Sequence, residues 1–182
     1  MNNLFLRHGE VFNPKNLHYA NLPGFGLSKL GIYQAKKAGN LIKKNFQINK
    51  ILTSPLLRAR QTAEIVNSFT NVEIEISNNL IEWSGPINWT GRTLKEIQTT
   101  AEFMVYKNNP ESLMLTNESF MDVFQRIAVL QMEIRNCLFV SHQDTIRSYF
   151  FYQLSENKFN NQKPDHCEIQ YLDGKKFKNL CI

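Results

Sequence analysis

Two histidines in this chain each follow a short run of apolar residues, the pattern expected of a side chain at the end of a buried strand. His8 comes after residues 4–6 and directly behind Arg7, and His142 comes shortly after residues 137–140. Ligands bind beside the carboxyl ends of the strands in an open α/β sheet. One such histidine is explained as a loop residue that ends a strand, but two of them indicate a shared site. A histidine flanked by a guanidinium is suited to chemistry on an anion.

Two further charged residues follow other predicted strands. Arg58 lies near the first turn of the helix that we expect after a strand at 51–53, where free backbone N–H groups favour an anion. Glu82 follows the alternating pattern of a strand at 72–76. A neutral imidazole such as that of His8 can attack phosphorus, guanidinium groups can hold a phosphoryl group, and a carboxylic acid can protonate the departing alkoxide. These residue types therefore predict phosphoryl transfer.

The elements that must position these residues alternate between strands and helices. Periodicity and caps predict helices at 28–45, 55–67, 119–134 and 145–154, strands at 4–6, 51–53, 72–76 and 137–140, a weaker helix from residue 93, and a hairpin over 168–181. Ser54 is expected to cap its helix, with Pro55 at the first helical position. This order predicts a single α/β domain over residues 1–182, a three-layer α/β/α sandwich with a mainly parallel, mixed sheet.

Composition fits one globular core and argues against several other classes. The chain has 182 residues, 42% hydrophobic content and a formal net charge of +5. Lysines of one predicted helix carry much of this charge without a nucleic-acid-binding module, so we expect no nucleic-acid partner. Because no apolar run could cross a bilayer and no signal peptide is evident, we expect a cytoplasmic protein without a membrane partner. The three cysteines lack metal-ligand spacing, and no pattern indicates an oligomeric state.

The motifs resemble those of the histidine phosphatase superfamily, in its phosphoglycerate mutase-like branch. They run nearly end to end in the family's order: Arg7-His8-Gly9-Glu10, Gly26-Leu27-Ser28, Ser54-Pro55-Leu56 with Arg58-Ala59, Leu80 with Glu82, and Val140-Ser141-His142 with Ile146-Arg147. The resemblance implies that His8 is the phosphorylated nucleophile, that Arg7, Arg58 and His142 form the phosphate pocket, and that Glu82 is the proton donor. It implies neither a metal nor another cofactor.

The sequence departs from the family pattern on both sides of the expected pocket. Gln143 and Asp144 follow the second histidine, where the family usually has small residues, often glycine. The backbone N–H of Gln143 can still contact phosphate, and we expect Asp144 to point away or to bond Arg147 or a backbone group. Val11 replaces the usual Ser or Thr after the first motif, and we expect Asn13 to take over one phosphate contact.

We predict a phosphomonoesterase that acts on a small phosphorylated substrate through a covalent phosphohistidine. The short stretch between Glu82 and His142 leaves the pocket open to water, which favours hydrolysis over a mutase of the cofactor-dependent type. A metal hydrolase is an alternative, because Glu10 and Asp144 each lie two residues beyond a histidine. A further alternative is a catalytically idle module that binds a phosphorylated ligand.

Two loop regions are expected to set the specificity of the site, residues 11–25 and residues 83–116. Proline, glycine and asparagine mark the first as an ordered loop. The tryptophans of the second either pack beneath Glu82 or line the mouth of the pocket. His18 and His166 lack the context of the other two histidines and are expected to be loop residues, either of which could touch substrate.

Overall fold

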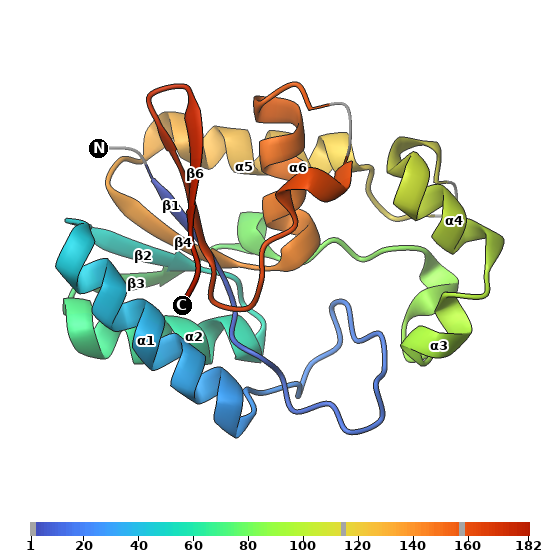
Figure 1. Cartoon of the computed structure of the whole chain (residues 1–182), viewed down its shortest axis with the longest axis horizontal. Coiled ribbons are helices and arrows are strands. Elements are labelled where there is room, and N and C mark those ends of the chain that lie inside the picture. The colour runs from blue at the N-terminus through green and yellow to red at the C-terminus, as the bar shows by residue number, and fades with distance from the viewer. Residues whose placement is uncertain (1–2, 114–115, 157–158) are drawn as a thin grey trace.

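A mixed six-stranded sheet forms the centre of the protein in the computed structural model, which describes residues 3–113, 116–156 and 159–182 (Figure 1). Residues 114–115, within the predicted specificity region 83–116, lie outside the described residues. The strand order is β3-β2-β4-β1-β5-β6. The strands are β1 (Leu4–Arg7), β2 (Lys50–Thr53), β3 (Glu73–Ile76), β4 (Cys137–Ser141), β5 (Ile169–Asp173) and β6 (Lys176–Leu180). The first four run parallel, and β5 and β6 form the antiparallel edge, which confirms the predicted mixed α/β sheet.

Helices cover both faces of this sheet because successive strand residues point to opposite sides. Leu4 and Leu6 of β1 share one hydrophobic cluster with buried residues of α1 (Lys29–Asn45) and α2 (Leu57–Thr70). Phe5, between them, belongs to a second cluster with α5 (Phe120–Glu133) and α6 (Gln143–Gln153). Figure 1 shows the two helix pairs on opposite sides of the strands. The α/β/α sandwich is therefore as predicted.

The helix caps agree with the sequence at two helices and differ at a third. Ser28 accepts a hydrogen bond from the N–H of Gly31 at the start of α1, and Ser119 forms a capping box with Asp122 at the start of α5. The prediction for α2 was wrong: this helix begins at Leu57, and its cap position makes no side-chain hydrogen bond. Ser54 lies before the helix, where its hydroxyl accepts a hydrogen bond from the N–H of Leu56 at 3.3 Å and lies 2.7 Å from Nε2 of His142.

Two long connections meet on the carboxyl side of the sheet. The first spans residues 8–28, and the second spans residues 77–119. The second contains short helices η1 (Asn78–Leu80), η2 (Ile87–Trp89), α3 (Leu94–Ile97), α4 (Ala101–Asn108) and η3 (Pro110–Ser112), and η4 (Phe159–Gln162) precedes β5. An isolated bridge joins Leu17 to Thr93, and the N–H of His18 donates to the carbonyl of Arg92 at 2.7 Å. Backbone contacts therefore join the two predicted specificity regions to each other.

The described helices are too short or too polar to cross a membrane.

Candidate active site

The sheet brings His8 and His142 together because β1 and β4 are parallel neighbours. Arg7 pairs with Ser141 in register, so the residues that follow leave the same edge of the sheet side by side. The N–H of His8 donates to the carbonyl of Ser141 at 3.0 Å. The two ring centroids are 5.1 Å apart with an interplanar angle of 61°. Both histidines thus lie at one site, as the strand-end pattern indicated.

One ring nitrogen of His8 is held by the backbone and the other is left for chemistry. Nδ1 lies 2.7 Å from the carbonyl oxygen of Gly9, and because a carbonyl only accepts, Nδ1 carries the hydrogen. Burial, followed by the charges of Arg58 and Arg7, holds the pKa of His8 well below its usual range. The ring is therefore neutral near pH 7, and Nε2 carries a lone pair. A neutral imidazole in this tautomer is a competent nucleophile.

Close backbone packing supports the segment that follows His8. A side-chain carbon added at Gly9 would lie 2.5 Å from the carbonyl oxygen of Gly31, which no real Cβ approaches. The N–H of Gly9 donates to the hydroxyl of Thr62 at 3.1 Å, and that hydroxyl donates to the carbonyl of Arg58 at 2.7 Å. The glycine in the first motif thus lets the loop lie directly against α1 while Thr62 ties it to α2.

His142 is fixed from the side of β2. Its Nε2 lies 2.7 Å from the hydroxyl oxygen of Ser54, and among the described residues its buried Nδ1 has no hydrogen-bond partner. Burial, then the charges of Arg58 and of His8, lower its pKa well below the usual range. This ring is also neutral, and its Nδ1 is the ring nitrogen that lacks a partner in the described part of the chain. His142 itself is 0% exposed.

The two predicted phosphate-binding arginines reach the site from different directions. Arg7 donates from Nη2 to Nε2 of His166 at 3.0 Å, and Arg58 donates from Nη2 to the carbonyl of Ala20 at 2.6 Å. The guanidinium of Arg58 also lies 4.6 Å from the ring centroid of Tyr19. The buried Nε of each arginine has no partner among the described residues. Burial is the main influence that lowers both pKa values, yet guanidinium groups keep their charge in proteins.

Glu82 has the properties of a carboxylic acid that exchanges protons near neutral pH. Its Oε1 accepts hydrogen bonds from the N–H of Trp83 at 2.9 Å and of Thr145 at 3.2 Å, and the Thr145 hydroxyl lies 3.1 Å away. Burial, with the nearby negative charge of Asp144 adding to it, raises the pKa of Glu82 to about 7, while Arg58 opposes this rise. These contacts converge on one oxygen, which leaves Oε2 to carry the proton.

Arg126 holds the segment that carries Glu82, and sequence reasoning missed it. From α5 its Nη2 donates to the carbonyl of Ile81 at 2.8 Å, and it also contacts the carbonyl of Asn79. Glu118 forms an ion pair with the same guanidinium at 3.1 Å. An arginine on a helix surface carries no sequence signal for such a contact, because its partners come from a distant loop.

The residues after His142 form a network at the start of α6. Asp144 accepts from the Tyr106 hydroxyl at 3.0 Å and forms an ion pair with Arg147, so the expected bond to Arg147 is present. Gln143, the first residue of α6, donates its side-chain amide to Asp144 at 3.3 Å. Its backbone lies in the first helical turn, where free N–H groups and the dipole favour an anion.

Asn13 lines the pocket, but its side chain is already engaged. Its amide donates to the carbonyl of Leu17 at 2.8 Å, and its Oδ1 accepts from the N–H of the same residue at 3.1 Å. This arrangement closes a local turn in the first loop. The predicted phosphate contact of Asn13 stays a prediction that requires this turn to open.

The alternative of a metal hydrolase lacks a converging ligand set. Glu10 accepts from the hydroxyl of Ser28 at 2.6 Å, and Asp144 bonds Tyr106 and Arg147. In the described part of the chain, no three side chains from His, Cys, Asp or Glu come together as a metal site requires. The paired carboxylates suggested by the sequence spacing are thus used as structural acceptors.

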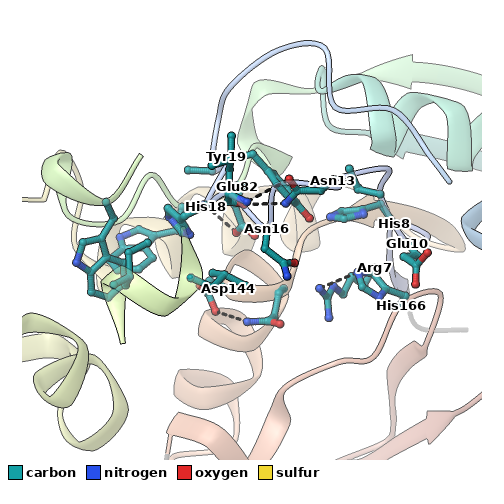
Figure 2. A pocket seen from close by; sticks show the side chains of 18 of the residues that line it. Arg7, His8, Glu10, Asn13, Asn16, His18, Tyr19, Glu82, Asp144 and His166 are labelled. Carbon is teal, nitrogen blue, oxygen red and sulfur yellow. Dashed lines mark hydrogen bonds between the residues drawn. The ribbon is translucent and has the colours of Figure 1, made fainter. Parts of the chain in front are cut away.

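A pocket of about 750 Å³ opens onto several of these groups. It is lined by Arg7, His8, Glu82 and Gln143 at the sheet edge, and it extends along the wall formed by the two loop regions. His18 and His166 are loop residues that both line it, and Trp83 and Trp89 are buried and also line it. Figure 2 shows His8, Arg7 and His166 together, with His18 and Asp144 across the pocket. Arg58 and His142, only 1% and 0% exposed, lie behind this lining.

The fold and the paired histidines define the class of protein. The sequence pattern of the Histidine phosphatase superfamily (branch 1) matches residues 4–179, and the chain belongs to this superfamily. The match covers nearly the whole chain, including both histidine motifs.

Matches to these individual proteins by sequence cover a smaller share of the chain than the match by structure. An uncharacterized protein of Mycobacterium tuberculosis is 38% identical over 77 residues, which cover 42% of this chain and 38% of that protein. A 2,3-bisphosphoglycerate-dependent phosphoglycerate mutase of Porphyromonas gingivalis is 43% identical over 60 residues, 32% of this chain and 24% of the mutase. The chain thus matches less than half the length of these curated relatives. A mycobacterial glucosyl-3-phosphoglycerate phosphatase shares the fold with a TM-score of 0.80 at 22% identity, over 92% of this chain and 87% of its own.

Proposed function

We propose that this protein is a phosphomonoesterase that transfers the phosphoryl group of a small phosphorylated substrate to His8 and then to water. The observation that carries the proposal is the hydrogen bond from Nδ1 of His8 to the carbonyl of Gly9, 2.7 Å long. It fixes the tautomer whose Nε2 can attack phosphorus, and burial beside two guanidinium groups keeps that ring neutral. Membership in the histidine phosphatase superfamily supports the same chemistry.

The first step forms a phosphorus–nitrogen bond and breaks the ester bond. Nε2 of His8 attacks phosphorus, the bond from phosphorus to the alcohol oxygen breaks, and the proton of Glu82 passes to the departing alkoxide. A pKa of about 7 means that a substantial fraction of Glu82 carries this proton at neutral pH. The products of the step are the free alcohol, phosphorylated His8 and ionised Glu82.

The second step returns the enzyme to its starting state. Water attacks phosphorus, its proton passes to the ionised Glu82, and the phosphorus–nitrogen bond breaks to release inorganic phosphate. Negative charge spread over the phosphoryl oxygens is stabilised by Arg7 and Arg58 and by the N-terminus of α6. The unpartnered Nδ1 of His142 offers a further hydrogen bond to the same group.

A mutase is the second candidate, because one relative is a 2,3-bisphosphoglycerate-dependent phosphoglycerate mutase. A mutase must keep water from its phosphohistidine until the substrate has reoriented. The pocket of about 750 Å³ reaches from His8 past the two loop regions, which leaves room for water beside a small substrate. This supports hydrolysis as the main outcome.

We further propose that the enzyme acts in the cytoplasm. Its cysteines, Cys137, Cys167 and Cys181, are all free thiols, which suits a reducing compartment.

A panel of phosphate monoesters tests the proposed function. We expect inorganic phosphate to be released from several small esters, and the His8→Ala variant to release none. With 3-phosphoglycerate, we expect phosphate release to exceed the formation of 2-phosphoglycerate. Faster isomerisation than hydrolysis would assign the protein as a mutase, and binding of the esters without release of phosphate would assign it as a binding module.

A further inference from the structure

The pocket has a second end that the phosphoryl chemistry does not use. Its lining away from the sheet edge includes six residues with neutral rings or aliphatic side chains, His18, Trp89, Leu94, Ile97, Phe103 and Tyr106. The ring of Trp89 lies with its centroid 5.6 Å from that of Tyr106 and 6.1 Å from that of Phe103. In Figure 2, His18 lies on the opposite side of the pocket from His8. We call these six residues the ring subsite.

The ring subsite contains two buried nitrogen atoms without a partner among the described residues. They are Nε1 of Trp89 and Nε2 of His18, and the indole itself is 2% exposed. Burial lowers the pKa of His18, so its imidazole is neutral near pH 7. Buried polar groups in folded proteins are nearly always hydrogen-bonded, and leaving one unpaired costs stability. A ligand with a hydrogen-bonding atom at this end would supply the missing partner.

The loops hold these two side chains in fixed positions. The N–H of Gly91 donates to the carbonyl of His18 at 2.8 Å, and the N–H of His18 donates to the carbonyl of Arg92 at 2.7 Å. The two rings meet edge to face, with centroids 5.7 Å apart and an interplanar angle of 89°. A subsite formed by loops that are bonded to each other is ready for a ligand before the ligand arrives, which lowers the entropic cost of binding.

Charged and amide side chains border the ring subsite, but its own residues are neutral. Lys107 and Gln98 also line the pocket and Asp144 accepts a hydrogen bond from Tyr106, whereas the six residues of the subsite are neutral rings and aliphatic side chains. A polyol packed against these six side chains would bury several hydroxyl groups for which the six offer few partners, at a cost for each. A planar, neutral ring instead packs against the aromatic walls, where ring pairs add to the effect of buried area.

We propose that the ring subsite binds the alcohol part of the substrate, and that this alcohol carries an aromatic or heteroaromatic ring with a hydrogen-bonding atom. The proposal rests on the proposed function, since the alcohol is the group that leaves when His8 is phosphorylated. It assigns a chemical class to the substrate, a phosphate monoester of a ring-bearing alcohol. The two loop regions expected to set specificity are the segments that form this subsite.

Four esters of primary alcohols separate this substrate class from others. Benzyl, pyridin-3-ylmethyl, cyclohexylmethyl and glycerol phosphates share the same departure chemistry but differ in ring planarity and polarity. We expect KM to be about three- to tenfold lower for benzyl than for cyclohexylmethyl phosphate, with glycerol phosphate the weakest. We expect the pyridine ester to gain a further advantage from its acceptor nitrogen. Equal KM values for the planar and the non-planar ring would overturn the proposal.

Two conservative substitutions test which side chains of the ring subsite cause these differences in KM. Trp89→Phe keeps a ring and removes the N–H, so it should erase the advantage of the pyridine ester over benzyl phosphate, about three- to tenfold. Phe103→Leu should raise KM for both planar esters and leave glycerol phosphate unchanged. Phe124→Leu, a half-buried aromatic outside the pocket, is the matched control and should change none of these ratios. Equal effects of Phe103→Leu on all four esters would contradict a ring subsite.

Failure of the proposed phosphoryl transfer can be distinguished from failure of the ring subsite. If none of the four esters releases phosphate, phosphoryl transfer fails, and calorimetric titration of the same esters into the protein then tests the subsite by itself. Tighter binding of benzyl than of cyclohexylmethyl phosphate, lost in Phe103→Leu, would support the subsite without catalysis. Equal binding of the two would refute it.

Discussion

The guanidinium of Arg7 donates from Nη2 to Nε2 of His166, 3.0 Å away, across a separation of 159 residues in the sequence. Because arginine can only donate, this imidazole must accept, which requires its neutral form with the hydrogen on Nδ1. Burial and the charge of Arg7 lower the pKa of His166 to about 3, so this condition holds throughout the neutral range. His166 is therefore a positioning residue for the arginine that precedes the nucleophile.

Removing that acceptor should weaken phosphate binding. We expect His166→Ala to lower kcat/KM about tenfold or more, since hydrogen bonds to charged groups contribute about 1.5–3 kcal/mol. The loss should appear mainly in KM, and His166→Asn should recover part of it because an amide oxygen can accept. In steady-state kinetics from about pH 6 to about pH 8, the ratio of wild-type to His166→Ala kcat/KM should stay the same, since His166 does not titrate there. A role limited to folding would leave the Asn variant as impaired as the Ala variant.

The proton of Glu82 should limit the reaction for alcohols of high pKa. In the free enzyme this carboxyl must be protonated for the first step, so kcat/KM for an alkyl phosphate should fall as the pH rises through about 7. Glu82→Gln should slow alkyl phosphates by about 10²–10⁴-fold and p-nitrophenyl phosphate much less, because p-nitrophenolate leaves without a proton. Equal losses on the two substrates would remove Glu82 from the role of acid.

The same raised pKa predicts a pH-dependent stability difference. The pKa of Glu82 rises from 4.5 in the unfolded reference to about 7 when folded, so the folded state holds the proton more tightly. This contribution to stability is fully present below about 4.5 and is lost as the pH rises through about 7. Relative to the wild type, Glu82→Gln should therefore gain on the order of 1–3 kcal/mol in free energy of unfolding between about pH 4.5 and about pH 8. Urea titrations at both pH values measure it, and a constant difference would contradict the raised pKa.

Arg58 should not tolerate replacement by lysine. Its planar guanidinium donates to Ala20 while its Nε stays available, and a lysine ammonium cannot do both in one geometry. We expect Arg58→Lys to reduce kcat/KM by roughly 10²–10³-fold, the usual loss for one preorganised donor. Arg60→Lys, an exposed arginine on the same helix, is the matched control and should behave as the wild type. Comparable rates for the two variants would argue that Arg58 does not bind the phosphoryl group.

Much of this site could be predicted from the sequence because its main residues follow directly from short strands. His8 and His142 each continue a buried apolar run, so the parallel pairing of β1 and β4 is enough to bring them together. The mixed sheet and its covering helices followed from the same periodicities. In these cases a local pattern determines the position of the side chain.

The predictions that needed a partner from elsewhere in the chain were incomplete or wrong. Ser54 has the sequence context of a helix cap and its hydroxyl does accept the N–H of Leu56, but the same hydroxyl also contacts His142 across a sequence separation of 88. Arg126 supports the Glu82 segment, and His166 supports Arg7, through contacts that only the tertiary fold creates. The bonding of Leu17 to Thr93 likewise joins two loops that the sequence suggested separately. Residue type and spacing do not indicate which residues far apart in the sequence will contact each other.

The most direct test of the account is to trap the phosphoryl group on His8. The protein is mixed with a radiolabelled phosphate ester and stopped in detergent at alkaline pH, where phosphohistidine survives, and the labelled peptide is identified by mass spectrometry. We predict label on His8, none on His142 or His166, and none in His8→Ala. Accumulated label should increase in Glu82→Gln with p-nitrophenyl phosphate, because the second step lacks its base. Phosphate release without label on His8, or label retained in His8→Ala, would contradict the covalent mechanism.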